Sequence, residues 1–360
     1  MAYEVDILAV GEESKSGDAI ALRFGNLPFD PKEQFIVVID GGFNASGKKL
    51  VERIKNEYDS TYVDLVISTH PDSDHINGLR VVLEELSVGQ LWMHTPWNIS
   101  EDVKRIAEVR SLKGSQFESS DKIKKSLQAA YDLEQLAIKK GVKIIEPFEG
   151  QSEFNNTIHI LGPHLDYYYE LTSQFDYNRG ISSVLRSFLN KIKETITDHW
   201  DKDQLEDPAE DAVSARNNSS VIVIANLGKT FLFLGDSGVP AIQKAADYAQ
   251  AKGFDMATDV HYIQVPHHGS KRNLGPTILD RIIGPKVPKG VETGKIAFIS
   301  AAVGHPKHPS KRVKNALIRR GLKVSETCGQ DHCFKSSDVP MRSGWEQLTY
   351  VDFCETYEEE

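Results

Sequence analysis

The sequence has few of the features that mark secreted or membrane proteins. It contains 3 cysteines in 360 residues, too few for a disulfide framework and typical of a reducing compartment. Its apolar runs are shorter than the roughly 20 residues that a membrane-spanning helix needs. The N-terminus has neither a basic segment nor a small-residue cleavage site, so we expect no signal peptide. These absences predict a cytoplasmic protein that does not insert into a membrane.

An overall positive charge is missing as well. The net charge is −10, so the average field of the molecule would not attract nucleic acid. Hydrophobic residues make up 40% and charged residues 26% of the chain, which is typical of a globular protein. A chain of this length suits either two domains or one large α/β sandwich.

Apolar runs alternate with segments of helical spacing along most of the chain. The runs "QFIVVIDGG" and "VDLVIST" predict buried strands, and each is followed by a segment whose apolar residues recur at helical spacing. The runs "SSVIVIANLG" and "KTFLFLGDSG" predict a hairpin. Residues 100–140 and 166–216 are rich in charge, and we interpret them as helical insertions. The pattern predicts an α/β fold.

Side chains of the kinds that bind metals gather where predicted strands end. They are His70, Asp72, Asp74 and His75 after the first strand, then His164, Asp236, and the pair His267 and His268. A single histidine at a strand end is more often an ordinary polar residue, but four such motifs in order indicate a site. Alternate residues of an extended loop point to one side, so His70, Asp72 and Asp74 can converge. Nitrogen and carboxylate ligands at this density suit one or two divalent ions.

Three of these motifs resemble the signature of the metallo-β-lactamase fold in its HxDxDH form. They are "STHPDSDHINGL", "FLFLGD" and "VPHHGS". The chain further resembles the hydrolase domain of the ComEC family of DNA-uptake proteins, through "GDA" at 17–19, "IDGG" at 39–42, "NNSS" at 217–220 and "HP" at 308–309. The resemblance extends from about residue 4 to about residue 325. The membrane channel of ComEC has no counterpart, so the resemblance does not extend to DNA uptake itself.

The resemblance implies a four-layer αββα sandwich with two metal ions between the sheets. We assign residues 1–335 to this hydrolase domain and 336–360 to a C-terminal extension that ends in an acidic tail. One ion would be bound by His70 and Asp72, and the other by Asp74 and His75. Asp236 would bridge the two ions.

Other ligands follow from the same resemblance. Either His267 or His268 would complete the second ion's shell, and we favour His268. Asp40 would orient a ligand through a hydrogen bond. His164 lies one residue from the position where relatives carry a third histidine, so it is either a ligand or a loop residue. Asp72 stands where the β-lactamases have a histidine, and its harder oxygen favours Mn²⁺ or Mg²⁺ without excluding Zn²⁺.

Basic residues gather late in the chain. The stretch from Val303 to Lys323 contains seven lysines and arginines and no acidic residue. It indicates either a phosphate-binding zone or an exposed helix with a basic face. For substrate binding we predict Ser270, Lys271, Arg272 and Asn273.

The sequence as a whole predicts a metal-dependent phosphodiesterase, a nuclease that cleaves DNA or RNA with a hydroxide activated by two metal ions. Its catalytic residues would be Asp74, Asp236 and His308. One alternative is a small-molecule hydrolase that acts on a cyclic nucleotide, a phosphocholine ester or a lactone. Another is an effector subunit of a defence-type system whose activity depends on a protein partner bound through the insertions.

Overall fold

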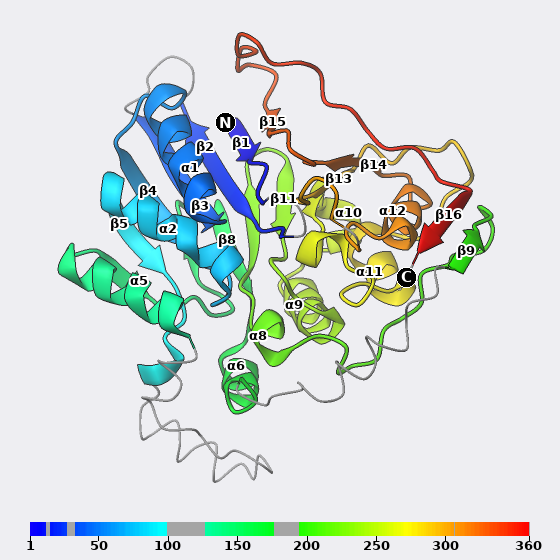
Figure 1. Ribbon diagram of the computed structural model, residues 1–360, viewed down its shortest axis with the longest axis horizontal. Helices are drawn as coiled ribbons and strands as arrows, with labels where there is room; N and C mark the ends of the chain where they lie inside the picture. The colour runs from blue at the N-terminus through cyan, green and yellow to red at the C-terminus, as the bar shows by residue number, and fades with distance from the viewer. Residues whose placement is uncertain (12–14, 27–32, 99–126, 176–193, 306, 360) are drawn as a thin grey trace.

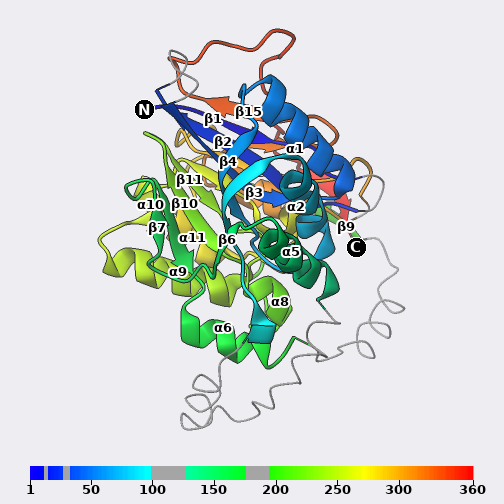
Figure 2. The ribbon, with the colours of Figure 1, turned by 90° about the vertical axis from the view of Figure 1, so that its left-hand side faces the viewer.

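Two large β-sheets pack face to face, and helices cover both outer faces. The computed structural model describes residues 1–360 apart from 12–14, 27–32, 99–126, 176–193, 306 and 360. Helices α1, α2 and α5 lie over one sheet and α9 to α12 over the other (Figure 1). Figure 2 shows the same layers after a quarter turn. The predicted four-layer αββα sandwich is confirmed.

The first sheet has an antiparallel half and a parallel half. Its seven strands, in spatial order, are β15 (His332–Lys335), β1 (Ala2–Ile7), β2 (Ala19–Gly25), β3 (Gln34–Gly41), β4 (Tyr62–Ile67), β5 (Ser87–Trp92) and β6 (Lys143–Ile145). The strands from β15 to β3 pair antiparallel. Those from β3 to β6 pair parallel.

The second sheet repeats this division. Its seven strands, in spatial order, are β14 (Lys323–Glu326), β13 (Ile296–Ile299), β12 (Tyr262–Gln264), β11 (Thr230–Phe233), β10 (Ile222–Asn226), β8 (Ile158–Gly162) and β7 (Ser152–Glu153). Strands β11 to β14 pair parallel. Strands β10 and β11 form the predicted antiparallel hairpin.

Helices pack on both sheets. The α-helices are α1 (Asn44–Asn56), α2 (Ser73–Glu85), α5 (Gln128–Lys139), α6 (Leu165–Thr172), α8 (Ala215–Asn218), α9 (Val239–Ala251), α10 (Met256–Asp259), α11 (Pro276–Ile283) and α12 (Lys311–Ile318). The part of the chain that the structure describes also contains the 3₁₀ turns η2 (Pro96–Asn98) and η3 (Pro266–Gly269). None of the helices in the described ranges has the length and apolar character needed to cross a membrane.

Strand side chains alternate between two hydrophobic layers. In β3, Val37 and Ile39 point into the core between the sheets, whereas Ile36 and Val38 pack against the helices. In the same way Val223 of β10 faces the sandwich core while Ile224 faces the outer helices. This period of two explains why both strands are almost entirely apolar, since each is buried on both faces.

The segments predicted as helical insertions are only partly helical. Residues 99–126 of the first lie outside the described residues, and α5 follows them. In the second, residues 176–193 lie outside the described residues, and a strand, β9 (Glu194–Thr197), comes next. This strand pairs antiparallel with β16 (Thr356–Glu359), so the acidic C-terminal segment is paired with the insertion. Polar composition suggested helix, but strand pairing over a long sequence separation prevails there.

A close approach of glycines positions the helix that follows β4. A Cβ built on Gly78 of α2 would lie 1.8 Å from the carbonyl oxygen of Gly41, at the end of β3. A Cβ built on Gly41 would in turn lie 2.6 Å from the carbonyl carbon of Gly78. Glycine at both positions therefore lets α2 rest directly on the turn after β3. The first turn of α2 is thereby placed beside that turn.

Candidate metal centre

The side chains of the candidate site come from the carboxyl ends of parallel strands in both sheets. Asp40 is the residue before the last of β3, and His70 follows β4. From the second sheet, Asp236 follows β11, and His267 and His268 follow β12. Parallel strands place their carboxyl ends at one edge of a sheet, where α/β proteins hold their ligands.

The cluster after β4 is not the extended loop that we predicted. Helix α2 begins at Ser73, so Asp74 and His75 lie in its first turn, and Asp72 is its N-cap residue. The amide of His75 donates to the carbonyl oxygen of Asp72 at 3.1 Å. Alternation therefore cannot explain why Asp74 lies on the same side as His70. The helical turn and the preceding bend bring them together instead.

Three histidines are each held by a hydrogen bond at Nδ1. His75 Nδ1 lies 2.7 Å from Asp40 Oδ2, an oxygen that only accepts. His268 Nδ1 lies 2.9 Å from the carbonyl oxygen of Ser300, which also only accepts. Both rings must therefore carry their proton on Nδ1, which leaves the lone pair of Nε2 free to bind a metal.

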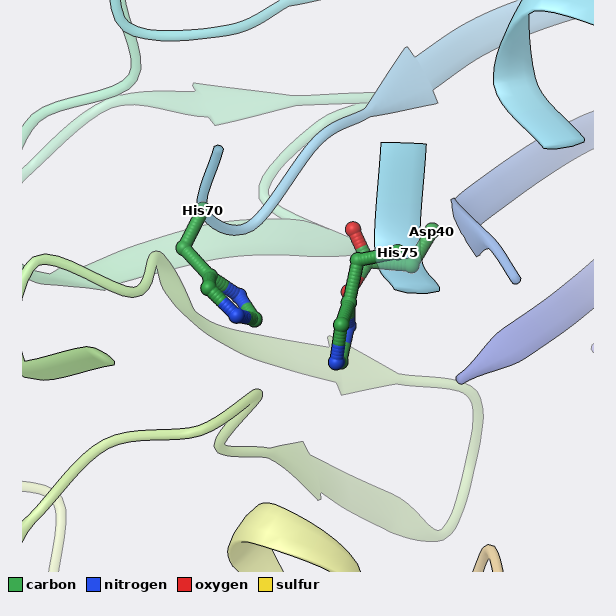
Figure 3. A group of neighbouring side chains, drawn as sticks. All are labelled: Asp40, His70 and His75. Carbon is green, nitrogen blue, oxygen red and sulfur yellow. The ribbon is translucent and has the colours of Figure 1, made fainter. Parts of the chain in front are cut away.

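The third histidine, His70, also carries its proton on Nδ1, and its hydrogen-bond partner is a hydroxyl group. Thr69 Oγ1 donates to Asp40 Oδ2 at 2.6 Å and lies 3.0 Å from His70 Nδ1. Since the single hydroxyl proton goes to the carboxylate, the oxygen accepts from His70 Nδ1. Figure 3 shows the rings of His70 and His75 extending in the same direction, with Asp40 beside His75. The Asp40 carboxylate thus orients both rings.

Asp236 lies between these two imidazoles. Its Oδ2 is 3.6 Å from His70 Nε2, and its Oδ1 is 3.5 Å from His75 Nε2. His268 Nε2 lies 4.0 Å from Asp74 Oδ2. One carboxylate facing two ring nitrogens through different oxygens has the arrangement of a bridging ligand.

The donor atoms at the centre are buried and lack hydrogen-bond partners. They are Nε2 of His70, His75 and His268, and Oδ1 of Asp236. Buried polar atoms are nearly always paired, because an unpaired one costs about 1–3 kcal/mol. Nitrogen and carboxylate atoms that converge without partners fit divalent cations, which would satisfy all of them at once.

The electrostatics of the centre also favour cations. Burial lowers the pKa of His70 and of His268, so these rings are neutral and available as ligands. Burial raises the pKa of Asp236. Burial disfavours the charged form of His75, but the nearby Asp236 and Asp40 outweigh it and raise its pKa. Without a metal ion this ring therefore favours a second proton on Nε2, and a bound cation would take the place of that proton. Carboxylates without a buried counter-charge are costly, and a bound cation removes that cost.

Within the described ranges, three groups of side chains could hold a metal ion. They are Asp40 with His70 and His75, Asp74 with His75 and His268, and Asp18 with His75 and Asp236. The predicted ligands His70, Asp74, His75, Asp236 and His268 all appear among them. Asp72 lies beside them, with Oδ2 4.0 Å from His70 Nε2.

His164 lies apart from this centre. It is the exposed N-cap residue of α6, and its Nδ1 accepts a hydrogen bond from the amide of Asp166 at 3.2 Å. It belongs to none of the groups of described residues that could hold a metal. Whether His164 is a ligand or a loop residue stays a prediction.

From the sequence we assigned no role to Asp18, although it lies in the "GDA" motif, and we did not identify Gln264. Gln264 Nε2 donates to Asp18 Oδ2 at 3.0 Å and to the Gly235 carbonyl oxygen at 3.2 Å, while its Oε1 accepts from the Leu234 amide at 2.7 Å. Burial raises the pKa of Asp18 to about 7. Gln264 thus ties the turn that carries Asp236 to the first sheet. Its signal in the sequence was a polar residue in an otherwise apolar strand.

A large basic cleft adjoins the centre. Its volume is about 850 Å³, and its cationic or imidazole lining comes from His267, Lys271, Arg272, His305, Lys307, His308, Lys311 and Lys314. Two acidic residues, Glu326 and Glu358, also line it. The predicted substrate residues Ser270, Lys271 and Arg272 all border this cleft. His308 does so too, and burial lowers its pKa to about 3.

Two parts of the predicted basic zone lie elsewhere. Asn273 is buried and donates to the backbone carbonyl oxygens of Asp236 and Ser237, so it braces the metal-site turn instead of facing substrate. Arg319 and Arg320 are buried as well. They follow helix α12, which ends at Ile318, and they pair with Asp198 and Asp203, whose side chains are themselves buried or nearly buried.

Comparisons with known proteins agree with this architecture. Residues 32–129 match the model of the Metallo-beta-lactamase superfamily, a stretch that contains β3, β4 and the cluster from His70 to His75. The two sheets with their helices match the sandwich fold of that superfamily. No curated protein matches the chain. The narrower resemblance to the ComEC hydrolase domain remains a prediction.

Several solved structures are distantly similar to this chain. The CmlA beta-hydroxylase is 10% identical with a TM-score of 0.39, and the match covers 92% of this chain and 54% of that one. A diphosphatase of the PhnP family is 10% identical with a TM-score of 0.38, over 93% of this chain and 98% of that one. A metallo-beta-lactamase from Hirschia baltica is 14% identical with a TM-score of 0.30, over 79% and 99%. Likenesses at this level say nothing about activity.

Proposed function

We propose that this protein is a metal-dependent phosphodiesterase and that its substrate is nucleic acid. The observation that carries the proposal is the convergence of three buried Nε2 lone pairs and the Asp236 carboxylate next to a cleft lined by lysine, arginine and histidine. The first feature suits a pair of divalent cations. The second suits an anionic substrate that follows the cleft.

The residues would hold two ions in the following way. One ion would be held by His70 and Asp72, the other by Asp74, His75 and His268, with Asp236 shared between them. Bound divalent ions lower the pKa of water and stabilise negative charge on a reacting phosphate. The mixture of imidazole and carboxylate donors suits Mn²⁺ or Zn²⁺, and Mg²⁺ is a further possibility.

The protein's own side chains would hold and orient the substrate. Lys271 and Arg272 border the cleft near His267, where they would neutralise the phosphate oxygens. His308 borders the same cleft, and its lowered pKa keeps its ring neutral, so it would serve as a hydrogen-bond partner for the leaving group or a phosphate oxygen. Thr69 and Asp40 would keep the metal-binding rings from turning.

The distribution of charge favours a polyanion over a small molecule. The whole chain has a net charge of −10, yet the cleft is lined by five lysines and arginines and by two glutamates. Local positive charge against an acidic average indicates that the cleft itself attracts anions. Lys314 is buried and pairs with Glu326, which leaves Lys271, Arg272, Lys307 and Lys311 for a substrate. A ligand with one phosphate would need two or three of these cations, whereas a strand with successive phosphates could engage all four.

The test is hydrolysis by the purified protein with Mn²⁺, Mg²⁺ or Zn²⁺. Labelled single- and double-stranded DNA, RNA and bis-p-nitrophenyl phosphate are offered in parallel, and Asp236→Ala is the inactive control. Metal-dependent cleavage of nucleic acid by the wild type alone supports the proposal. Cleavage of bis-p-nitrophenyl phosphate without cleavage of any nucleic acid favours a small-molecule hydrolase. Activity that appears only after another protein is added favours the partner-dependent effector.

A further inference from the structure

We propose that His267, the neighbour of a metal-binding histidine, donates a hydrogen bond from Nε2 to a substrate phosphate oxygen, and that Asn217 holds it in that tautomer. The inference rests on the proposed phosphodiesterase function. It assigns different roles to two adjacent histidines that the sequence does not distinguish. It also gives a role to Asn217, which lies in α8, far from η3 in the chain.

The backbone separates the two histidine side chains. Both residues adopt the left-handed conformation, with φ of 48° for His267 and 57° for His268. This conformation is unfavourable for residues with a Cβ, so the surrounding structure must impose it. The amide of His267 donates to the Gly235 carbonyl oxygen at 3.1 Å, which ties the turn to the one that carries Asp236.

As a result the two rings point to different places. Their planes are 88° apart, and their centroids lie 5.6 Å from each other. The His268 side chain is 5% exposed and reaches the metal centre, whereas the His267 side chain is 35% exposed and borders the basic cleft. The His267 ring lies 5.8 Å from that of His308, on the same cleft wall.

The hydrogen bonds of Asn217 determine its amide orientation. Ser214 Oγ lies 2.6 Å from Asn217 Oδ1 and can donate to it. Asn217 Nδ2 lies 3.2 Å from Asp236 Oδ2, an oxygen that only accepts. Turning the amide round would place oxygen against carboxylate oxygen, so Nδ2 must face Asp236.

This orientation settles which His267 nitrogen carries the proton. Asn217 Nδ2 also lies 3.1 Å from His267 Nδ1. An amide nitrogen has two hydrogens and no lone pair to offer, so it donates one to Asp236 and the other to His267. His267 Nδ1 therefore accepts, and the neutral ring carries its proton on Nε2.

The tautomer of His267 is opposite to that of the three ligand histidines. In His70, His75 and His268 the proton lies on Nδ1 and the lone pair of Nε2 faces the centre. In His267 the Nδ1 lone pair is engaged by Asn217, and Nε2 carries a proton, so neither nitrogen is available to a metal. Nδ1 is the nitrogen that lies near Asp236, at 3.7 Å from its Oδ2. A neutral N–H at Nε2 is a donor suited to a non-bridging phosphate oxygen.

Histidine NMR tests the tautomer without using activity. In Zn²⁺-loaded protein labelled with ¹⁵N-histidine, the resonances that vanish in His267→Gln belong to His267. We expect a protonated Nε2, an unprotonated Nδ1, and a shift of Nε2 when inorganic phosphate is added. In Asn217→Ala this fixed tautomer should be lost. A protonated Nδ1 in the wild type, or an Nε2 signal that phosphate leaves unchanged, overturns the inference.

Metal content and kinetics test the separate roles of the two histidines. We expect His267→Ala to retain both ions and to lose about ten- to a hundredfold in kcat/KM for bis-p-nitrophenyl phosphate, the value of a hydrogen bond to a charged group. His267→Gln keeps a donor and should recover part of this loss. His268→Ala should lose an ion, and His164→Ala should retain both ions and wild-type kinetics.

These outcomes separate the inference from the proposed function. Loss of an ion in His267→Ala, or kinetics equal to those of the wild type, overturns the role of His267. A wild type that is inactive on every phosphodiester refutes the proposed function instead. The NMR and metal measurements would in that case still decide whether His267 is excluded from the metal shell and whether it contacts phosphate.

Discussion

Replacing Asp40 by asparagine changes one atom of the side chain and tests how the metal centre is built. The residue is 1% exposed and has φ of 56°, a conformation that asparagine tolerates as well as aspartate does. The backbone should therefore be unaffected. What changes is the acceptor capacity of the side chain, since Asp40 accepts from Thr69 N at 2.8 Å, Thr69 Oγ1 at 2.6 Å and His75 Nδ1 at 2.7 Å.

The asparagine cannot satisfy all three donors. If its NH₂ group takes the place of Oδ2, it meets the hydrogen of His75 Nδ1, and the His75 ring must adopt the other tautomer. Nε2 then carries a proton and is no longer a ligand. If the NH₂ group takes the place of Oδ1, it meets the amide hydrogen of Thr69 instead. In both cases metal binding has to compensate for a lost hydrogen bond.

The expected loss of metal affinity follows from the role of Asp40 in orienting His75. Residues that orient a metal-binding histidine typically affect metal affinity about 10- to 100-fold, which is about 1.4–2.7 kcal/mol. We expect Asp40→Asn to weaken Zn²⁺ or Mn²⁺ binding by that factor in isothermal titration of the metal-free protein. The matched control is Asp64→Asn, since Asp64 is another partly buried aspartate that accepts from a backbone amide, at 2.8 Å from Ile36 N.

The control distinguishes orientation of a ligand from general damage. Asp64→Asn should lower stability but leave metal affinity unchanged, because Asp64 contacts none of the candidate ligands in the described hydrogen bonds. Equal metal affinity in Asp40→Asn and the wild type would refute the argument that this carboxylate selects the tautomer of His75.

Three further predictions concern packing, substrate charge and pH. Gly78→Ala should lower the free energy of unfolding in urea, because its Cβ would lie 1.8 Å from the Gly41 carbonyl oxygen and overpacking costs about 1–3 kcal/mol, more than the helix propensity of about 1 kcal/mol that alanine gains. Lys271→Glu combined with Arg272→Glu should weaken DNA binding and reduce its salt slope by about 2, measured by fluorescence anisotropy from low to moderate salt. His94→Phe should make stability less dependent on pH between about 3 and 6.5, since burial lowers the pKa of His94 from 6.5 to about 3. The unfolded chain binds the proton in that window and the folded one does not, so acid destabilises the wild type by up to about 1.4 kcal/mol per pH unit through this ring.

Each of these has a result that contradicts it. An Arg80→Ala variant of the same helix, at an exposed position, should lose far less stability than Gly78→Ala, and a stabilised Gly78→Ala would show that α2 can move away freely. The control Lys48→Glu with Lys49→Glu changes the net charge by the same amount on an exposed helix face. An equal change in salt slope in this control would show that the cleft is not the surface that binds DNA. An unaltered pH profile in His94→Phe would mean that His94 takes up protons in the folded state.

The fold was predictable because the strands carry an unambiguous pattern. Short apolar runs such as Ile36 to Ile39, ended by a turn signal, indicate strands buried on both faces, and their regular alternation with helices implies layers. The ligand types were predictable from their positions after these strands. The local geometry was not, since the helix α2 begins within the cluster and not after it. Helix starts depend on capping contacts that a short polar run does not specify.

Residues that act through other residues were harder to find. Asp18 and Gln264 are separated by 246 positions, and only the packing of one sheet on the other brings them to hydrogen-bond distance. Asn273 resembled a substrate residue because it follows Lys271 and Arg272, yet its amide is turned inward to the backbone at Asp236. Sequence adjacency gives no information on which way a side chain points in an irregular turn.

The charges of the centre link metal binding to stability. Asp18, Asp40 and Asp236 are all at most 3% exposed, and their nearest buried bases are imidazoles, two of which burial holds in the neutral form. Without an ion, the folded state must either keep carboxylates charged in a poorly solvated place or bind protons there. A ligand that binds only the folded state stabilises it by about 2.7 kcal/mol at 100 times its dissociation constant. Removal of metal should therefore lower the unfolding temperature, and Asp236→Ala, which deletes the carboxylate between His70 and His75, should lose much of that dependence on metal because both the repulsion and the site disappear together.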